Sequence, residues 1–147
     1  MFLGEYSHSI DEKGRLTIPA RYRQLLAQGA YITQGFDHNL MVLRPATFDS
    51  MKKKVSEMSF TKPQVRELNR FLFSRAELIE PDGSGRILIP QFLRDWIKLD
   101  GEAMVVGAGS YFEIWPPAIW KKQIEHTQES KDNAGYFADL DLFANEQ

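Results

Sequence analysis

The apolar residues of this chain recur in short runs rich in β-branched and aromatic side chains, and turn-forming residues separate the runs. Runs of this length and composition are typical of short β-strands. The connecting segments GFDHN (residues 35–39) and GAGSY (residues 107–111) are rich in turn formers, so each predicts a strand turn. The pattern therefore predicts strands at residues 15–18, 30–33, 40–43, 86–89, 103–106 and 112–115.

Prolines mark the starts of the expected helices. Proline has no N–H to give to strand pairing and suits the first turn of a helix. Pro19 and Pro90 therefore predict short helices at residues 20–27 and 91–99. A longer helix is expected after Pro45, where apolar residues fall at helical spacing, and a weaker one after Pro117. The apolar positions are Phe48, Met51, Val55 and Met58 in the first, and Trp120, Ile124 and Thr127 in the second.

A further helix is expected in the connector between these segments. Thr61 and Gln64 have the spacing of a capping box, which predicts a helix start. Val65, Leu68 and Leu72 then form one apolar side.

The chain contains an internal repeat. DEKGRLTIPARYR at residues 11–23 and DGSGRILIPQFLR at residues 82–94 share the pattern Asp-x-x-Gly-Arg-apolar-x-Ile-Pro. With one inserted residue, the whole correspondence runs for some 38 residues. The aligned residues are Asp11, Gly14, Arg15, Leu16, Ile18, Pro19 and Arg23 with Asp82, Gly85, Arg86, Ile87, Ile89, Pro90 and Arg94, then Gly35, Val42, Pro45, Ala46 and Phe48 with Gly107, Ile114, Pro117, Ala118 and Trp120.

Each repeat reads as a ββαββα unit in which the glycine of the Asp-x-x-Gly turn takes the positive φ that a tight hairpin needs. One unit of four short strands cannot bury both faces of its sheet, whereas two units can interleave their hairpins into one closed barrel without free edges. We therefore expect an α+β fold, mainly β, with a pseudo-two-fold barrel and a connector helix. The expected boundaries are 5–47 for the first repeat, 48–75 for the connector helices, 76–119 for the second repeat and 120–147 for a C-terminal helix and tail.

The two halves of the chain carry opposite net charges, although the whole chain is nearly neutral. The formal net charge is −2. Residues 1–75 hold 12 Lys and Arg against 7 Asp and Glu, a balance of +5, and residues 76–147 hold 6 against 13, a balance of −7. Such asymmetry points to a polyanionic partner on one side, although unevenly spread solubilising charges would produce it as well.

Several function classes find no support in the sequence. The chain has no cysteine, hence no disulfide or thiolate metal site, and His8, His38 and His126 show no metal-ligand spacing. Gly107 and Gly109 lack the third glycine and following helix of a dinucleotide-binding loop, and no P-loop motif occurs. We expect no enzyme activity, cofactor, metal or small-molecule substrate. The N-terminus lacks the features of a signal peptide and no apolar run approaches about 20 residues, so a cytoplasmic protein without membrane attachment is expected.

The doubled motif, with FEIW at residues 112–115 and the lead MFLGEY, resembles the MraZ family of bacterial transcriptional regulators. The resemblance covers nearly all of residues 1–125. It implies an AbrB-like swapped-hairpin barrel of the double-psi type, with both halves in one chain. It also implies a ring-shaped homo-oligomer that binds double-stranded DNA at short direct repeats. The implied role is control, as a nucleoid-associated repressor, of the division and cell-wall gene cluster that includes the protein's own promoter.

Arg15 and Arg86 are the main candidates for DNA contact, because a guanidinium at the mouth of a hairpin can bind a phosphate or a guanine edge. The alternative is a local Asp–Arg pair that holds each turn. Additional basic residues occur only in the first copy, and Gly83-Ser84 replaces Glu12-Lys13 in the second. The expected DNA-binding residues are Asp11, Lys13, Gly14, Arg15, Arg21 and Arg23, with Arg86 as a weaker member; the lysines at 52–54 are interpreted as a solvated helix face.

A different class of function remains open: an oligomeric module that binds a protein partner, with an incidental basic patch. Five apolar residues exceed what one small barrel should need, and we expect them at a subunit interface: Phe71, Leu72, Phe73, Ile119 and Trp120.

Overall fold

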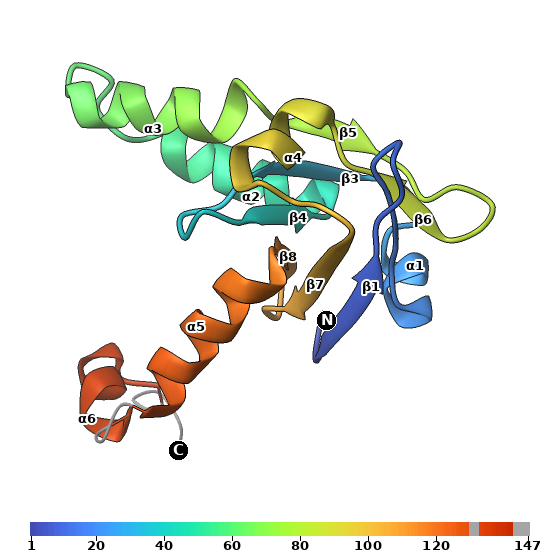
Figure 1. The fold of residues 1–147 in the computed structure, drawn as a ribbon. Helices are drawn as coiled ribbons and strands as arrows, with labels where there is room; N and C mark the ends of the chain where they lie inside the picture. The colour runs from blue at the N-terminus through green and yellow to red at the C-terminus, as the bar shows by residue number, and fades with distance from the viewer. Residues whose placement is uncertain (130–132, 143–147) are drawn as a thin grey trace. The chain divides into compact units, whose positions relative to one another are not determined.

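The fold is described from a computed structural model, which describes residues 1–129 and 133–142. It separates into two compact units, residues 1–117 and residues 118–147. The first contains both repeats and the second contains most of the last long helix (Figure 1). The strands are β1 (Glu5–Ser9), β2 (Arg15–Thr17), β3 (Ala30–Gln34), β4 (Leu40–Leu43), β5 (Glu77–Ile79), β6 (Arg86–Leu88), β7 (Glu102–Gly107) and β8 (Tyr111–Trp115). The helices are α1 (Ala20–Leu25), α2 (Pro45–Ser56), α3 (Pro63–Phe73), α4 (Gln91–Ile97), α5 (Pro117–Glu129), α6 (Asn133–Phe137) and the 3-10 turn η1 (Ala138–Leu140).

The predicted strands and helices are present in the predicted order, with boundaries that differ by a few residues. The helix α1 ends at Leu25 and α4 at Ile97, two residues earlier than expected in each case. After α4, Lys98 has a φ of +55°, a left-handed conformation that terminates the helix. Among the described residues, no helix is long and apolar enough to cross a membrane.

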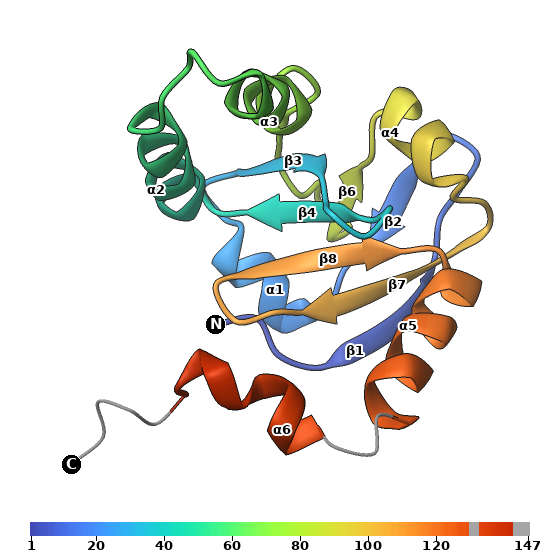
Figure 2. The same ribbon diagram turned by 90° about the vertical axis from the view of Figure 1, so that its left-hand side faces the viewer.

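The two repeats exchange strands. The large sheet has the order β1-β7-β8-β4-β3-β5, and β2 pairs with β6 in a second sheet. All of the pairings are antiparallel, and Figure 2 shows β3, β4, β8, β7 and β1 side by side. The first strand of each repeat therefore pairs with the third strand of the other. If each strand is replaced by its counterpart in the other repeat, the strand order of the large sheet stays the same but runs in reverse. A pseudo-two-fold arrangement requires this.

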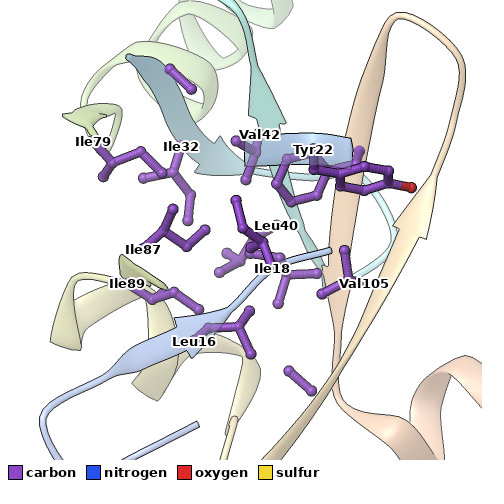
Figure 3. Close-up of a cluster of buried hydrophobic side chains, with 14 of the residues drawn as sticks. Leu16, Ile18, Tyr22, Ile32, Leu40, Val42, Ile79, Ile87, Ile89 and Val105 are labelled. Atoms are coloured by element: carbon purple, nitrogen blue, oxygen red, sulfur yellow. The ribbon is translucent and has the colours of Figure 1, made fainter. Parts of the chain in front are cut away.

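One hydrophobic core serves both repeats. Leu16 and Ile18 from the first repeat and Ile87 and Ile89 from the second are fully buried in the same cluster (Figure 3). Further members from both repeats are Tyr22, Ile32, Leu40, Val42, Ile79 and Val105. This confirms the expectation that the halves share one core instead of packing as separate domains. Burial of each large aliphatic side chain contributes roughly 1.5–3 kcal/mol, and the pairing of two strands of only three residues depends on it.

The outer face of β3 and β4 is covered by α2 and α3, which lie beside these strands in both ribbon views (Figures 1 and 2). Phe48 and Val55 of α2 and Leu72 of α3 form a second buried cluster with Met41 and Leu43. Thr33 Oγ1 donates to the Leu72 carbonyl at 2.5 Å, and Gln34 Nε2 to the Phe71 carbonyl at 2.9 Å. These bonds satisfy carbonyl groups of the last helical turn and hold it on β3.

This arrangement corrects the expectation for the connector. Leu72 is only 2% exposed, and Phe71 and Phe73 are half-buried against the same cluster. They are part of the chain's own packing, so they are not surplus apolar surface. Sequence spacing could not show that α3 folds back over β3. In the second unit, Ile119 is 38% exposed and Trp120 is half-buried.

The predicted capping box is also wrong. The helix α3 begins at Pro63, and its N-cap residue Lys62 makes no capping bond through its side chain. Thr61 Oγ1 is instead 2.8 Å from Ser59 Oγ, and Arg66 Nη1 donates to the Thr61 carbonyl at 3.0 Å. The N-cap position is occupied by Lys62, whose side chain carries no acceptor oxygen, so Thr61 lies one residue too early to cap the helix. The apolar side of α3 is as predicted, with Val65 and Leu72 buried.

Candidate nucleic-acid interface

The Asp-x-x-Gly turn of the first repeat is closed by its own aspartate. Asp11 Oδ1 accepts hydrogen bonds from the backbone N–H groups of Lys13 at 3.0 Å and Arg15 at 2.9 Å. Asp11 Oδ2 accepts one from Arg15 Nε at 2.7 Å. Gly14, with a φ of +88°, donates its N–H to the Asp11 carbonyl at 3.0 Å. The local Asp–Arg pair considered in the sequence is therefore present.

The second repeat builds the same turn. Asp82 Oδ1 accepts from the N–H groups of Ser84 and Arg86, both at 2.9 Å, and Asp82 Oδ2 accepts from Arg86 Nε at 3.0 Å. Gly85 has a φ of +74°. Because both copies make these bonds, the motif has a structural role that does not depend on a ligand.

The pairing of β2 with β6 brings the two turns together. Ile89 donates its N–H to the Gly14 carbonyl at 2.8 Å, and Ile18 donates to the Gly85 carbonyl at 3.2 Å. Arg86 Nη1 also lies 3.8 Å from Asp11 Oδ2. Asp11 thus faces the arginines of both repeats, and Arg86 faces two carboxylates.

Arg15 differs from Arg86 in this respect. Within residues 1–129 and 133–142, Arg15 pairs with Asp11 alone, through Nε, which leaves its Nη groups available to a ligand. The side chains of Arg15 and Arg86 are 36% and 30% exposed. Arg15 therefore has fewer carboxylate partners than Arg86, which favours Arg15 for a contact to DNA.

The carboxylates at this edge stay ionised. The pKa of Asp11 is lowered, first by the hydrogen bond from the Arg15 backbone N–H and also by the Arg15 guanidinium. The pKa of Asp82 is lowered chiefly by the Arg86 backbone N–H. Each acceptor bond favours the charged form of the carboxyl group.

The net positive charge of the first turn is smaller than its lysine and arginine residues alone suggest. Glu12 is exposed beside the exposed Lys13. The charges of Asp11 and Glu12 formally balance those of Lys13 and Arg15. Contact with a polyanion therefore depends on which side chains face it, and Arg21, exposed on α1, adds a positive charge outside the turn.

Arg23 is placed differently from the other candidates. It is half-buried, its Nε donates to the Ile18 carbonyl at 3.2 Å, and its guanidinium packs on Gly85 of the second turn. Arg94 of α4 makes the reciprocal arrangement, donating to the Ile89 carbonyl at 3.0 Å and packing on Gly14. The structure thus gathers Asp11, Gly14, Arg15 and Arg86 at one place and sets Arg23 against the opposite turn. The alignment of Arg23 with Arg94 was the available signal for a shared structural role.

His8 on β1 is a further group that the sequence did not single out. Burial lowers its pKa, and the nearby charge of Arg23 adds to the effect. Its Nε2 is buried without a hydrogen-bond partner among the described residues, and its ring stacks on Tyr6 with centroids 6.4 Å apart. Burial and the charge of Arg23 therefore disfavour the protonated form of His8.

Few of the described residues are placed for metal binding or acid–base chemistry. Among residues 1–129 and 133–142, no cluster of three His, Asp or Glu side chains is placed to hold a metal ion. Burial raises the pKa of Glu113, although Trp115 Nε1 donates to its Oε1 at 3.1 Å.

A mainly apolar pocket of about 720 Å³ lies between α2 and the outer face of the sheet, lined by Met41, Met51, Val55, Met58 and Tyr111 among others. The side chains of the lysines at 52–54 are exposed, as expected.

Comparison with known proteins gives consistent matches. The model of the family described as "MraZ protein, putative antitoxin-like" matches twice, over residues 1–71 and 72–139. The chain is 43% identical to a protein of Roseiflexus castenholzii named "Transcriptional regulator MraZ", with 94% of each chain covered. Proteins of the same name from Desulfitobacterium hafniense (strain DSM 10664 / DCB-2) and Thermomicrobium roseum are 40% and 42% identical. These two alignments cover 91% and 85% of this chain and 94% and 88% of the relatives.

Proposed function

The chain belongs to the MraZ family, and from that premise we propose that it is a transcriptional regulator that binds double-stranded DNA through the turn of its first repeat. Its relatives over most of the chain are named transcriptional regulators, which supports the regulatory role. The observation that supports the choice of turn is the difference between the arginines: Arg15 is paired with one carboxylate and Arg86 faces two.

In the proposed complex Arg15 makes the specific contact. With Nε bonded to Asp11, its Nη groups can donate to a guanine edge or to a phosphate. Lys13 and Arg21, both exposed, contribute phosphate contacts that position the protein without reading sequence. Arg86 contributes less because Asp11 and Asp82 both face it.

The strand exchange supports an assignment of the fold as an AbrB-like swapped-hairpin barrel of the double-psi type. We place its repeats at 5–47 and 76–119, the connector at 48–75 and the C-terminal helix and tail at 120–147. The regulator acts in the cytoplasm at the nucleoid, as a repressor of the division and cell-wall gene cluster and of its own promoter.

One turn can make few contacts, so we propose that several copies bind short direct repeats together as a ring. Joining the copies makes the later contacts intramolecular, and avidity can then add about two to four orders of magnitude. The open apolar pocket beside α2, with Phe36 65% and Met58 45% exposed at its lining, supports self-association, because soluble monomers rarely leave large apolar patches uncovered.

A salt titration of DNA binding tests the proposal. The protein is mixed with DNA from upstream of its own gene and with a scrambled duplex of equal length, and affinity is measured by gel shift or anisotropy at several salt concentrations. We expect preference for the upstream DNA and an affinity that falls with salt, by nearly one unit of log–log slope per neutralised phosphate. Equal affinity for both duplexes would contradict sequence-specific binding.

The apolar pocket also favours a second candidate, a module that binds a protein partner without reading DNA. The two candidates give different results in the same titration, because a protein-binding module shows no DNA binding to titrate.

A further inference from the structure

Each turn is covered by an arginine that belongs to the other repeat. A Cβ atom built on Gly14 would lie 2.5 Å from Arg94 Nε and 2.6 Å from Arg94 Cζ, so the guanidinium lies directly on the face of this glycine. Arg94 is 80 positions further along the chain, on α4. Gly85 is covered in the same way by Arg23 of α1.

Hydrogen bonds connect each of these arginines to the turn that it covers. Arg94 Nε donates to the Ile89 carbonyl at 3.0 Å, and the N–H of Ile89 donates to the Gly14 carbonyl at 2.8 Å. The same residue therefore bonds both the covering guanidinium and the covered glycine. The other turn has the same two bonds: Arg23 Nε donates to the Ile18 carbonyl, and the N–H of Ile18 donates to the Gly85 carbonyl, both at 3.2 Å.

The position of Arg94 also joins it to the acidic side of the first turn. Arg94 lines a small cavity of about 170 Å³ with Asp11 and Glu12. A side chain of the second repeat therefore lies on the glycine of the first turn and borders the same cavity as its acidic residues.

We propose that the two arginines are positioning residues whose roles are crossed between repeats: Arg94 holds the first-repeat turn, and Arg23 holds the second-repeat turn. Arg94 acts on Arg15 through Gly14, and it does not touch DNA. Arg23, although it belongs to the basic first copy, has little influence on the first turn. The consequence for DNA binding rests on the function proposed above, whereas the crossed support of the turns does not.

Amide hydrogen exchange measured residue by residue tests the crossing without DNA. The variants are Arg94→Met and Arg23→Met, which keep a long stem and lose the guanidinium. The N–H groups of Gly14 and Arg15 are bonded to Asp11, and those of Gly85 and Arg86 to Asp82, so their exchange reports closure of each turn. We expect Arg94→Met to accelerate exchange of the first pair by about tenfold and to leave the second pair near its original rate, because turns open locally. Arg23→Met should do the opposite. Acceleration in the variant's own repeat would overturn the proposal.

A variant that does not fold is replaced by the corresponding lysine. Arg94→Lys and Arg23→Lys keep the charge but cannot lie as a planar group on glycine, so they should show the same crossed pattern with smaller changes. Equal acceleration of both turns in the lysine variants would overturn the crossed assignment.

DNA affinity then tests the consequence. Arg94→Met should weaken binding by about tenfold with an unchanged salt slope, because no phosphate contact is lost, and Arg23→Met should change affinity by less than about threefold. A slope smaller by about one unit in Arg94→Met would mean that Arg94 contacts phosphate, which contradicts a positioning role. Crossed exchange with unaltered DNA affinity in both variants would support the crossed positioning and count against the first turn as the DNA-binding element.

Discussion

Arg86 Nη1 lies 3.8 Å from Asp11 Oδ2, and this contact joins the turn of the second repeat to the turn of the first. No reciprocal ion pair between Arg15 and Asp82 occurs within the described part of the chain. An otherwise symmetric pair of turns is therefore electrostatically unequal.

The two aspartates should differ in their effect on stability. Asp11→Asn weakens the pairing of two arginines, whereas Asp82→Asn affects Arg86 alone. We expect both variants to lower the Tm, with the larger fall for Asp11→Asn. Thermal unfolding followed by circular dichroism at neutral pH measures this, and an equal or larger fall for Asp82→Asn would show that the cross-repeat contact is not significant.

The two arginines should differ in their effect on DNA binding. Arg15→Ala removes the proposed specific contact from every copy in an assembly, and a contact of this kind contributes about 1–3 kcal/mol of discrimination per site. Arg86→Ala should weaken DNA binding clearly less than Arg15→Ala, because two carboxylates face Arg86. Affinity for a multi-repeat operator is measured, with circular dichroism as the folding control. The assignment to the first turn is wrong if folded Arg15→Ala binds like the parent or if Arg86→Ala is the more damaging.

Removing the carboxylate of Glu12 should strengthen DNA binding. Glu12 is exposed in the turn that we propose to meet the phosphates, where a negative charge is repelled. Glu12→Gln should raise affinity about two- to fivefold at low salt, as expected for exposed charge interactions of up to about 1 kcal/mol, and less as salt screens the charge. Glu57→Gln, at the exposed C-cap of α2, serves as the matched control and should leave affinity unchanged. Equal gains in both variants would indicate a general charge effect.

His8 should make the fold sensitive to mild acid. Its pKa in the folded protein is below the usual 6.5, because burial and Arg23 disfavour the protonated ring. As pH falls below about 6.5 the unfolded chain takes up the proton first, so the free energy of unfolding decreases until the lower folded pKa is reached. Urea unfolding between pH 7.5 and 5.5 should show a decrease that is smaller in His8→Gln. The same decrease in parent and variant would assign the acid sensitivity to other groups.

Local features of this protein were predictable from its sequence. The duplicated motif, the prolines after β2 and β6 and the glycines at positive φ act within a few residues, through the missing proline N–H and the missing glycine side chain. The strands and most helix starts follow from them, and so does the Asp–Arg pair within each turn. The capping box at Thr61 failed because the helix begins at Pro63, which makes Lys62 and not Thr61 the N-cap residue.

Contacts between distant segments were decided only by the tertiary structure. Pairing of β1 with β7 and of β5 with β3 brings together residues up to about one hundred positions apart, and the periodicity of a strand does not specify its partner. Leu72 became a core residue because α3 packs on β3, and the Arg23 guanidinium came to lie on Gly85 of the second turn because the repeats exchange strands. The sequence determined the parts and their symmetry, whereas the contacts of each basic side chain depended on which repeat it met in space.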